Sequence, residues 1–152
     1  MGLEASTQAR TSTKLYTGSA MSIFIDSGAF IAYYNKDDQF HKSAIELFEQ
    51  IESNEFGYAI TSDYIIDEAT ARVLIQLGKQ KAIELGERIF ENYPIIHIDS
   101  ELLKEAWKKF VKFKPFTLTD CTNLVIMENH NLDYIFTFDG DFKNFVKTIG
   151  PK

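Results

Sequence analysis

The sequence has very little cysteine and no long apolar run. Cys121 is the single cysteine among 152 residues, so an intramolecular disulfide and a zinc site built from cysteine pairs are both excluded. A membrane-spanning helix needs roughly 20 apolar residues, and the apolar stretches here are short pieces such as residues 134–138. These absences predict a soluble protein in a reducing, cytoplasmic setting without membrane contact.

Several common catalytic patterns are missing as well. No glycine-rich phosphate-binding motif occurs, and His41, His97 and His130 share no metal-ligand spacing, so surface or structural roles are expected for them. Cys121 lies near an expected helix start, but no histidine stands beside it in sequence to activate a thiolate. The sequence therefore argues against a nucleotide cofactor, a histidine-held metal and a cysteine hydrolase.

Positive charge is also in short supply. Lys and Arg number 16 against 22 Asp and Glu, which gives a net charge of −6. Such a balance argues against a nucleic-acid partner, because affinity for phosphates comes mainly from Lys and Arg. The argument weakens if carboxylates gather around a divalent cation, since the cation inverts the local field that a phosphate meets.

The chain is long enough for one domain with a sizeable core. Residues 1–20 are rich in Ser, Thr, Ala and Gly and lack hydrophobic periodicity, so we interpret them as an expression scar or a flexible extension. Met21 stands directly before the first convincing strand, and we expect the native start there. The predicted folded domain is residues 21–152.

Strand-like and helix-like patterns alternate along this domain. The expected strands are residues 23–26, 57–61, 94–98 and 134–138. The expected helices are one after a turn at residues 27–28, then 39–53, one from a cap at Ser62 or Asp63 to Gly78, 80–92, 100–113 and 119–130. Strands separated by helices predict an α/β fold with a parallel sheet.

Four acidic residues occupy notable places in this scheme. Asp26 and Asp139 close the first and last expected strands, and Asp120 lies in the first turn of its helix. Glu68 flanks an apolar helical stripe formed by Ile65, Ala69, Val73 and Leu77. Ligands of open parallel sheets bind outside the carboxyl ends of the strands, so we expect these four acids to converge there.

Converging carboxylates raise one another's pKa values and favour a divalent cation. Oxygen ligands select a hard ion such as Mg²⁺ or Mn²⁺, which suits phosphodiester hydrolysis. Taken singly, each acid also has a structural alternative: a helix N-terminal charge for Asp120, turn positions around Gly140 for Asp139 and Asp141, and an ion pair with Arg72 for Glu68.

The segments FIDSGAFIAYYN, TSDYIIDEATARVL, FTLTDCTNLVIM and IFTFDGDF occur in this order along residues 23–145. Together they resemble the four acidic motifs of PIN domains, especially those of VapC-like toxin ribonucleases. The resemblance implies a three-layer α/β domain with a short central parallel sheet flanked by helices. It also implies Mg²⁺- or Mn²⁺-dependent cleavage of single-stranded or loop RNA, a protein antitoxin as partner, and a homodimer.

Residue roles follow from the same resemblance. The acidic ligands correspond to Asp26, Glu68, Asp120 and Asp139, and Asp141 corresponds to an extra acid present in some members. Ser27 and Thr119 match polar neighbours of these acids. Asn123 is treated as a supporting group, because family members vary at the positions after the third acid.

One basic concentration remains to be explained. Lys104, Lys108, Lys109 and Lys112 fall on the polar arc of the expected helix at 100–113, and Lys114 follows it. A solvated helix face is one interpretation, and a track for the RNA backbone is the other.

Two further functions stay open beside the toxin nuclease: a non-catalytic RNA-binding or RNA-maturation PIN protein, and a DNA nuclease of the related flap type.

Overall fold

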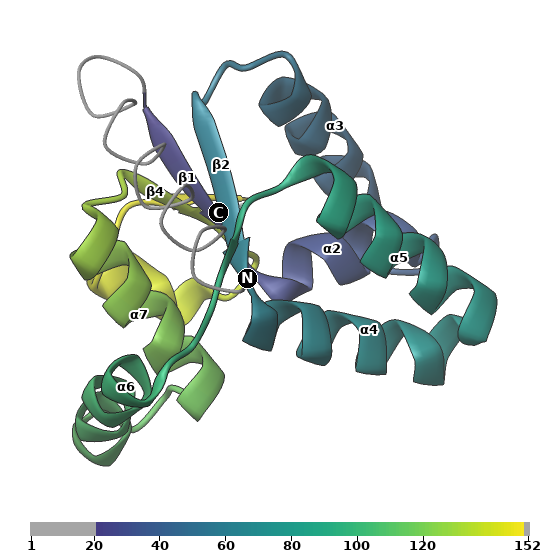
Figure 1. The fold of residues 1–152 in the computed structure, drawn as a ribbon. Helices are drawn as coiled ribbons and strands as arrows, with labels where there is room; N and C mark the ends of the chain where they lie inside the picture. The colour runs from purple at the N-terminus through teal and green to yellow at the C-terminus, as the bar shows by residue number, and fades with distance from the viewer. Residues whose placement is uncertain (1–20, 151–152) are drawn as a thin grey trace, which may run out of the picture.

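One parallel five-stranded sheet forms the centre of the molecule in a computed structural model that describes residues 21–150 (Figure 1). The strand order is β3-β2-β1-β4-β5, and β1 lies in the middle with Phe24 level with Ile60 and Ile135. The prediction of an α/β fold with a parallel sheet is confirmed. The strands are β1 (Ser22–Ile25), β2 (Tyr58–Ser62), β3 (Ile95–Ile96), β4 (Tyr134–Phe136) and β5 (Thr148–Ile149).

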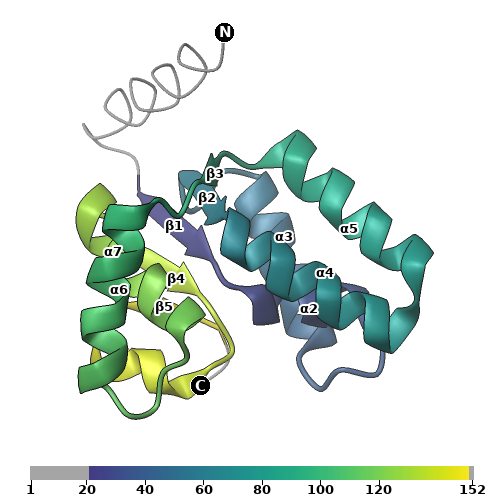
Figure 2. The same ribbon diagram turned by 60° about the horizontal axis from the view of Figure 1, so that its bottom comes forward.

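Helices cover both faces of the sheet and make three layers. Figures 1 and 2 show α2, α3, α4 and α5 together on one side of the sheet and α6 and α7 on the other. The first group is α2 (Ser27–Tyr34), α3 (His41–Glu52), α4 (Asp63–Leu77) and α5 (Lys79–Asn92), and the second is α6 (Ser100–Lys112) and α7 (Leu118–His130). None of the helices in residues 21–150 combines the length and the apolar character needed to cross a bilayer.

The core fills the space between these layers. Ile23, Phe24 and Ile25 of β1 are fully buried, which explains why this strand is an unbroken apolar run rather than an alternating one. On the four-helix side, the ring of Phe48 in α3 lies 5.1 Å from that of Phe136 in β4. The central strand is therefore fixed on both faces, and so is the residue that follows it.

Helix ends follow local capping chemistry. The hydroxyl of Ser62 accepts a hydrogen bond from the backbone N–H of Ile65 and caps α4, as one of the two predicted caps. Gly78, with φ of +92°, separates α4 from α5 at the predicted position. The start of α7 was predicted at Thr119, but the helix begins at Leu118 with Thr117 as its cap.

Two strands are shorter than the sequence predicted, and one was missed. β3 and β4 end before residues 97 and 137, and β5 and the short 3-10 helix Gly140–Asn144 were not predicted. A two-residue edge strand is too short to show a periodic pattern in the sequence. β5 is defined instead by its pairing with β4, for example by the carbonyl of Ile149, which accepts from Thr137 N–H. The interpretation of residues 1–20 lies outside the described residues.

Candidate active site

Asp26 lies at the carboxyl end of the central strand. It follows β1 directly and precedes α2, and its backbone N–H donates to the carbonyl of Phe136 at 3.0 Å. This bond continues the β1–β4 ladder by one residue, so the sheet fixes where the side chain starts. Its relative exposure is 5%, and it is the only charged residue that is buried within residues 21–150.

Three donors from separate parts of the chain hold the Asp26 carboxylate. Ser27 N–H and Asn123 Nδ2 donate to Oδ1 at 2.8 and 3.1 Å, and the hydroxyl of Thr137 donates to Oδ2 at 2.8 Å. The donors come from the start of α2, from α7 and from the end of the β4 ladder. The carboxylate therefore has a fixed orientation before any ligand binds.

Burial raises the pKa of Asp26 to about 7. The hydrogen bond from Thr137 and that from Ser27 lower it, while the negative charges of Asp120 and Glu68 raise it further. The repulsion comes from carboxylates carried by α7 and α4. A positive charge placed among them would favour the ionised form.

Glu68 is half-buried on α4, on the side of the helix that faces Asp26. Burial raises the pKa of its carboxyl, and the charge of Asp120 acts in the same direction. A hydrogen bond with Ser27 and the charge of Arg72 lower it. Ser27, predicted as a polar neighbour of the acids, thus contacts both Asp26 and Glu68.

Asp120 has a structural and an electrostatic role at once. Its Oδ2 accepts from Thr117 N–H at 2.9 Å while Thr117 Oγ1 accepts from Asp120 N–H at 3.1 Å, which makes a capping box at the start of α7. Burial raises the pKa of Asp120, the bonds with Thr117 lower it, and the charges of Asp139 and Asp141 raise it. The cap fixes the carboxylate without removing it from the other acids.

Asp139 and Asp141 are both exposed and lie beyond β4. The N–H of Asp139 donates to the hydroxyl of Thr137 at 3.1 Å, and its Oδ1 accepts from Asp141 N–H at 2.9 Å. Asp139 therefore caps the short 3-10 helix rather than closing the strand itself. Of the two, the charge of Asp139 has the larger effect on the pKa of Asp120.

The acidic side chains are near one another without forming a ready-made chelate. Within residues 21–150, no three Asp, Glu, His or Cys side chains are grouped closely enough to hold a metal ion as they stand. Repulsion among unneutralised carboxylates favours such separation. We refer to Asp26, Glu68, Asp120 and Asp139 below as the acidic rim.

The family model described as the PIN domain matches residues 23–147, which is most of the chain. The chain belongs to the PIN domain family. The VapC ribonuclease of Archaeoglobus fulgidus is 27% identical over 135 residues, an alignment that spans 86% of this chain and 83% of the relative.

Two solved structures share the fold of this PIN domain. One is the crystal structure of Mycobacterium tuberculosis VapC20, a toxin that cleaves the sarcin-ricin loop, with a TM-score of 0.77 and 21% identity over 85% of this chain and 99% of that one. The other is VapBC2 of Rickettsia felis bound to a DNA fragment from its promoter, with a TM-score of 0.61 and 12% identity over 87% and 100% of the two chains.

The structure also shows what the sequence missed around the acids. The hydroxyl of Thr137 donates to Asp26 and accepts a hydrogen bond from the N–H of Asp139. Thr137 was not among the residues predicted for the site. Its position two residues before Asp139 was the available signal, because alternate residues of an extended segment face the same side. Thr119 was a candidate, but among the contacts shown only its carbonyl takes part, accepting from the Thr122 hydroxyl.

Cysteine and histidine take structural positions in this PIN domain. Cys121 is fully buried, and burial raises the pKa of its thiol, which opposes nucleophilic use. His41 Nδ1 lies 2.7 Å from the carbonyl of Ala32, and His97 Nδ1 lies 2.6 Å from Asp63 Oδ2. These contacts agree with the structural roles expected for both histidines.

The lysines of α6 are largely compensated by glutamates. Lys109 is only 22% exposed and ties α6 to α7, whereas the other paired lysines stand on the open face of the helix. Lys112 lies over the ring of Phe113, with its Nζ 5.5 Å from the ring centre. The ion pairs are Lys104–Glu101 at 3.5 Å, Lys108–Glu105 at 2.9 Å and Lys109–Glu128 at 2.7 Å.

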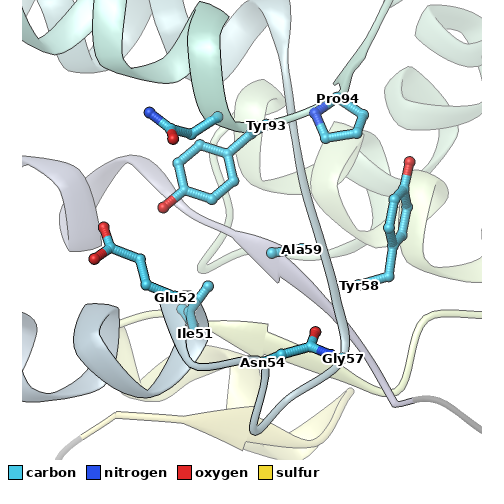
Figure 3. Close-up of a pocket in the computed structure, with 9 residues that line it drawn as sticks. Ile51, Glu52, Asn54, Gly57, Tyr58, Ala59, Tyr93 and Pro94 are labelled. Carbon is cyan, nitrogen blue, oxygen red and sulfur yellow. The ribbon is translucent and has the colours of Figure 1, made fainter.

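A pocket of about 590 Å³ lies at the other end of the sheet, where β2 begins (Figure 3). Tyr58 at its edge is level with Ser22, the first residue of β1, whereas Asp26 follows the last. Figure 3 shows the ring of Tyr93 in this pocket with its hydroxyl on the side of Glu52. No residue of the acidic rim lines the pocket, so the two features are separate.

Proposed function

We propose that this PIN domain is a metal-dependent endoribonuclease that hydrolyses phosphodiester bonds in single-stranded or loop RNA, and that it is the toxin of a toxin–antitoxin pair. The observation that supports this most is the buried carboxylate of Asp26, held by three donors and repelled by carboxylates from two other elements. A purely structural site would not retain a buried acid among acids, because each charge raises the cost of the next.

The residues present fit a hard divalent cation. The acidic rim offers only oxygen atoms, which Mg²⁺ and Mn²⁺ prefer. Burial and neighbouring negative charges raise the pKa values of Asp26, Glu68 and Asp120 in the absence of a counter-charge. Beside Asp26, the buried Oδ1 of Asn123 accepts no hydrogen bond from the described residues, and a metal-bound water would supply that donor. When bound, the ion would polarise the phosphodiester and lower the pKa of the attacking water.

The chain's own residues would orient this chemistry. Asn123, Thr137 and Ser27 fix the direction of the Asp26 carboxylate, which we assign as a primary ligand. Asp120 is held by the α7 cap and Glu68 by α4, so both would approach from rigid helices. Asp139, which follows β4 and acts on Asp120, completes the acidic rim, with Asp141 in support.

The proposal of a partner protein depends on the similar proteins and not on the geometry of the site. The similar proteins include a VapC ribonuclease and the VapBC2 assembly, which support an antitoxin partner for this chain. An arginine of the antitoxin entering the acidic rim would neutralise it, since a guanidinium matches paired carboxylates. A cytoplasmic location and a homodimer belong to the same proposal.

Cleavage of one RNA pool tests the proposed activity. We expect cleavage with Mg²⁺ or Mn²⁺, none with EDTA, and a loss of more than about 100-fold for Asp26→Asn or Asp120→Asn, because even outer groups of metal sites typically cost 10–100-fold. Glu87→Gln, on the exposed face of α5, serves as the matched control and should cleave like the wild type. Full activity of both rim variants would refute the mechanism.

A further inference from the structure

We infer that Phe40 and Phe138 form a platform that binds one nucleobase of the RNA, placing the adjacent phosphate at the acidic rim. The inference rests on the proposed nuclease function and adds a binding subsite to it. The two rings are parallel, with an interplanar angle of 4° and centroids 4.6 Å apart. Both side chains are partly exposed to solvent.

The two phenylalanines differ in how they are supported. Phe138 meets the buried ring of Phe136 edge-on at 5.6 Å and packs against the hydrophobic core. Phe40 does not belong to the core residues or to those packed against them, and its described ring contact is the one with Phe138. A partly exposed aromatic ring outside the core contributes less to folding than a buried one, so a binding role gives it a further purpose.

The loop between α2 and α3 holds Phe40 in place. Asp38 Oδ1 accepts from the N–H of Phe40 at 2.8 Å, and Asn35 Oδ1 accepts from the N–H of Asp37 at 3.1 Å. On the far side of Phe40, His41 is tied through its ring to the carbonyl of Ala32. The platform is therefore pre-organised, and stacking on it would cost little conformational entropy.

The platform adjoins the acidic rim through the backbone. Phe138 stands between Thr137, which donates to Asp26, and Asp139, whose charge acts on Asp120. Alternation along the extended segment places Phe138 on the α3 side of the sheet, beside Phe136, and Thr137 on the α7 side with Asn123. A strand of RNA crossing this edge would meet carboxylates on one side and aromatic rings on the other.

A nucleobase is the occupant that the chemistry of this edge favours. The chain carries a net charge of −6, so phosphate attraction alone gives limited affinity, and base stacking on aromatic rings supplies affinity without requiring positive charge. Bases inside a duplex have their faces covered, whereas those of single strands and loops are accessible. The platform would thus select unpaired RNA.

Binding in EDTA separates this subsite from the cleavage reaction. The probe is a single-stranded RNA in which one adenine is replaced by the fluorescent base 2-aminopurine, scanned through successive positions of the cleaved sequence. We expect the wild type to quench the probe at one position next to the cut. Phe40→Leu should remove that quench and weaken binding roughly tenfold, the size expected for one stacked base.

Two further variants keep the test specific. Phe40→Tyr retains a ring and should restore both the quench and the affinity, while Phe90→Leu removes an exposed ring on α5 and should match the wild type. Thermal unfolding of Phe40→Leu should stay near that of the wild type, because the ring lies outside the core.

The outcomes distinguish this inference from the proposed function. Cleavage with Mn²⁺ together with an unchanged quench and affinity in Phe40→Leu overturns the platform and leaves the nuclease intact. The same loss in Phe90→Leu as in Phe40→Leu also overturns it, since the effect would then not belong to this edge. Absence of both RNA binding and cleavage in the wild type overturns the proposed function and the platform with it.

Discussion

At the scale of single residues, Asp26 is the group whose ionised form is most disfavoured by its surroundings. Its carboxylate is buried and receives three hydrogen bonds, yet its pKa stays near 7 because desolvation and two neighbouring acids outweigh those bonds. A fold optimised only for stability would place an apolar or amide side chain here. A bound cation, as proposed above, would relieve this repulsion.

This raised pKa predicts the pH dependence of folding. The pKa of Asp26 is about 7 in the folded state and 3.8 for an ordinary, solvent-exposed aspartate, so between those pH values the folded state holds a proton that the unfolded state has lost. Stability must then fall as pH rises from about 4 to 7, by up to about 4 kcal/mol at roughly 1.4 kcal/mol per unit. Urea unfolding of metal-free protein at pH 5 and pH 8 measures this fall.

Asp26→Asn provides the comparison for that measurement. An asparagine keeps an oxygen for Ser27 N–H and Asn123 and can donate to the Thr137 hydroxyl, but it does not ionise. We expect this variant to be more stable than the wild type at pH 8 and to lose most of the pH dependence. An equal fall in both proteins would show that Asp26 is not the group responsible.

Asp139 and Asp141 differ in how firmly they are placed. The N–H of each is hydrogen-bonded, Asp139 to Thr137 and Asp141 to Asp139, but only the carboxylate of Asp139 is itself held, by Asp141 N–H, among the contacts of the described residues. The charge of Asp139 also has the larger effect on the pKa of Asp120. We expect Asp139→Asn to reduce activity and Mn²⁺ affinity about tenfold more than Asp141→Asn. If the Asp141 variant is the more damaged in Mn²⁺ titrations, the two roles are exchanged.

The sequence predicted the four rim acids but not how they are held. Strand ends and helix starts indicate where a backbone lies, so Asp26 and Asp120 could be assigned to one edge. The donors of Asp26 could not be assigned from spacing, because Thr137 and Asp26 lie 111 residues apart and meet only in the sheet. Phe40 was missed for the same reason, since its partner Phe138 is distant in the chain.

At the scale of elements, ion pairing with glutamates leaves fewer of the α6 lysines available to bind phosphate than the sequence alone indicates. Lys104 and Lys108 lie next to Glu101 and Glu105 one turn earlier, and Lys109 is tied to Glu128 of α7. Lys112 ends α6 and Lys114 lies in the turn that follows, on the way to Asp120, and both are exposed. The RNA track stays a prediction, and we now expect Lys112 and Lys114 to contribute more to it than the paired lysines.

Salt dependence of RNA binding tests that assignment. Each phosphate contact to a single strand contributes roughly 0.7 to the slope of log affinity against log salt, so Lys112→Ala with Lys114→Ala should flatten the slope by about one. The matched pair Lys104→Ala with Lys108→Ala should change it less, because Glu101 and Glu105 already compensate these charges. Equal slopes in all three proteins would make α6 an ordinary solvated helix.

Elements with strong periodicity were predicted well, and short ones were not. α4 was predicted from its stripe of Ile65, Ala69, Val73 and Leu77, because a regular apolar face can be recognised from the sequence alone. The first three are buried, and Leu77 is partly buried against the core. β5 and the end of β4 depend on pairing with a neighbouring strand rather than on their own residues. Their limits could therefore be found only from the assembled sheet.

At the scale of the whole molecule, the apolar surface that remains exposed bears on assembly. Trp107, Phe110 and Val111 lie within one turn of α6, with relative exposures of 54%, 39% and 73%, and the rings of Trp107 and Phe110 are 5.3 Å apart. Aromatic residues grouped in this way are typical of protein interfaces. The homodimer that the family resemblance implies would bury this surface, which we call the α6 patch.

Light scattering at micromolar concentration should therefore give twice the mass of the chain. Trp107 is the only tryptophan, so its emission should shift to shorter wavelength as dilute protein is concentrated and the indole leaves water. Val111→Lys should give a monomer, because an ammonium buried in an apolar contact without a partner is costly. Ile75→Lys, on α4 and 84% exposed, is the matched control and should remain dimeric. A wild type that scatters only as a monomer would refute the dimer, and a dimer lost in Ile75→Lys but kept in Val111→Lys would move the interface from α6 to α4.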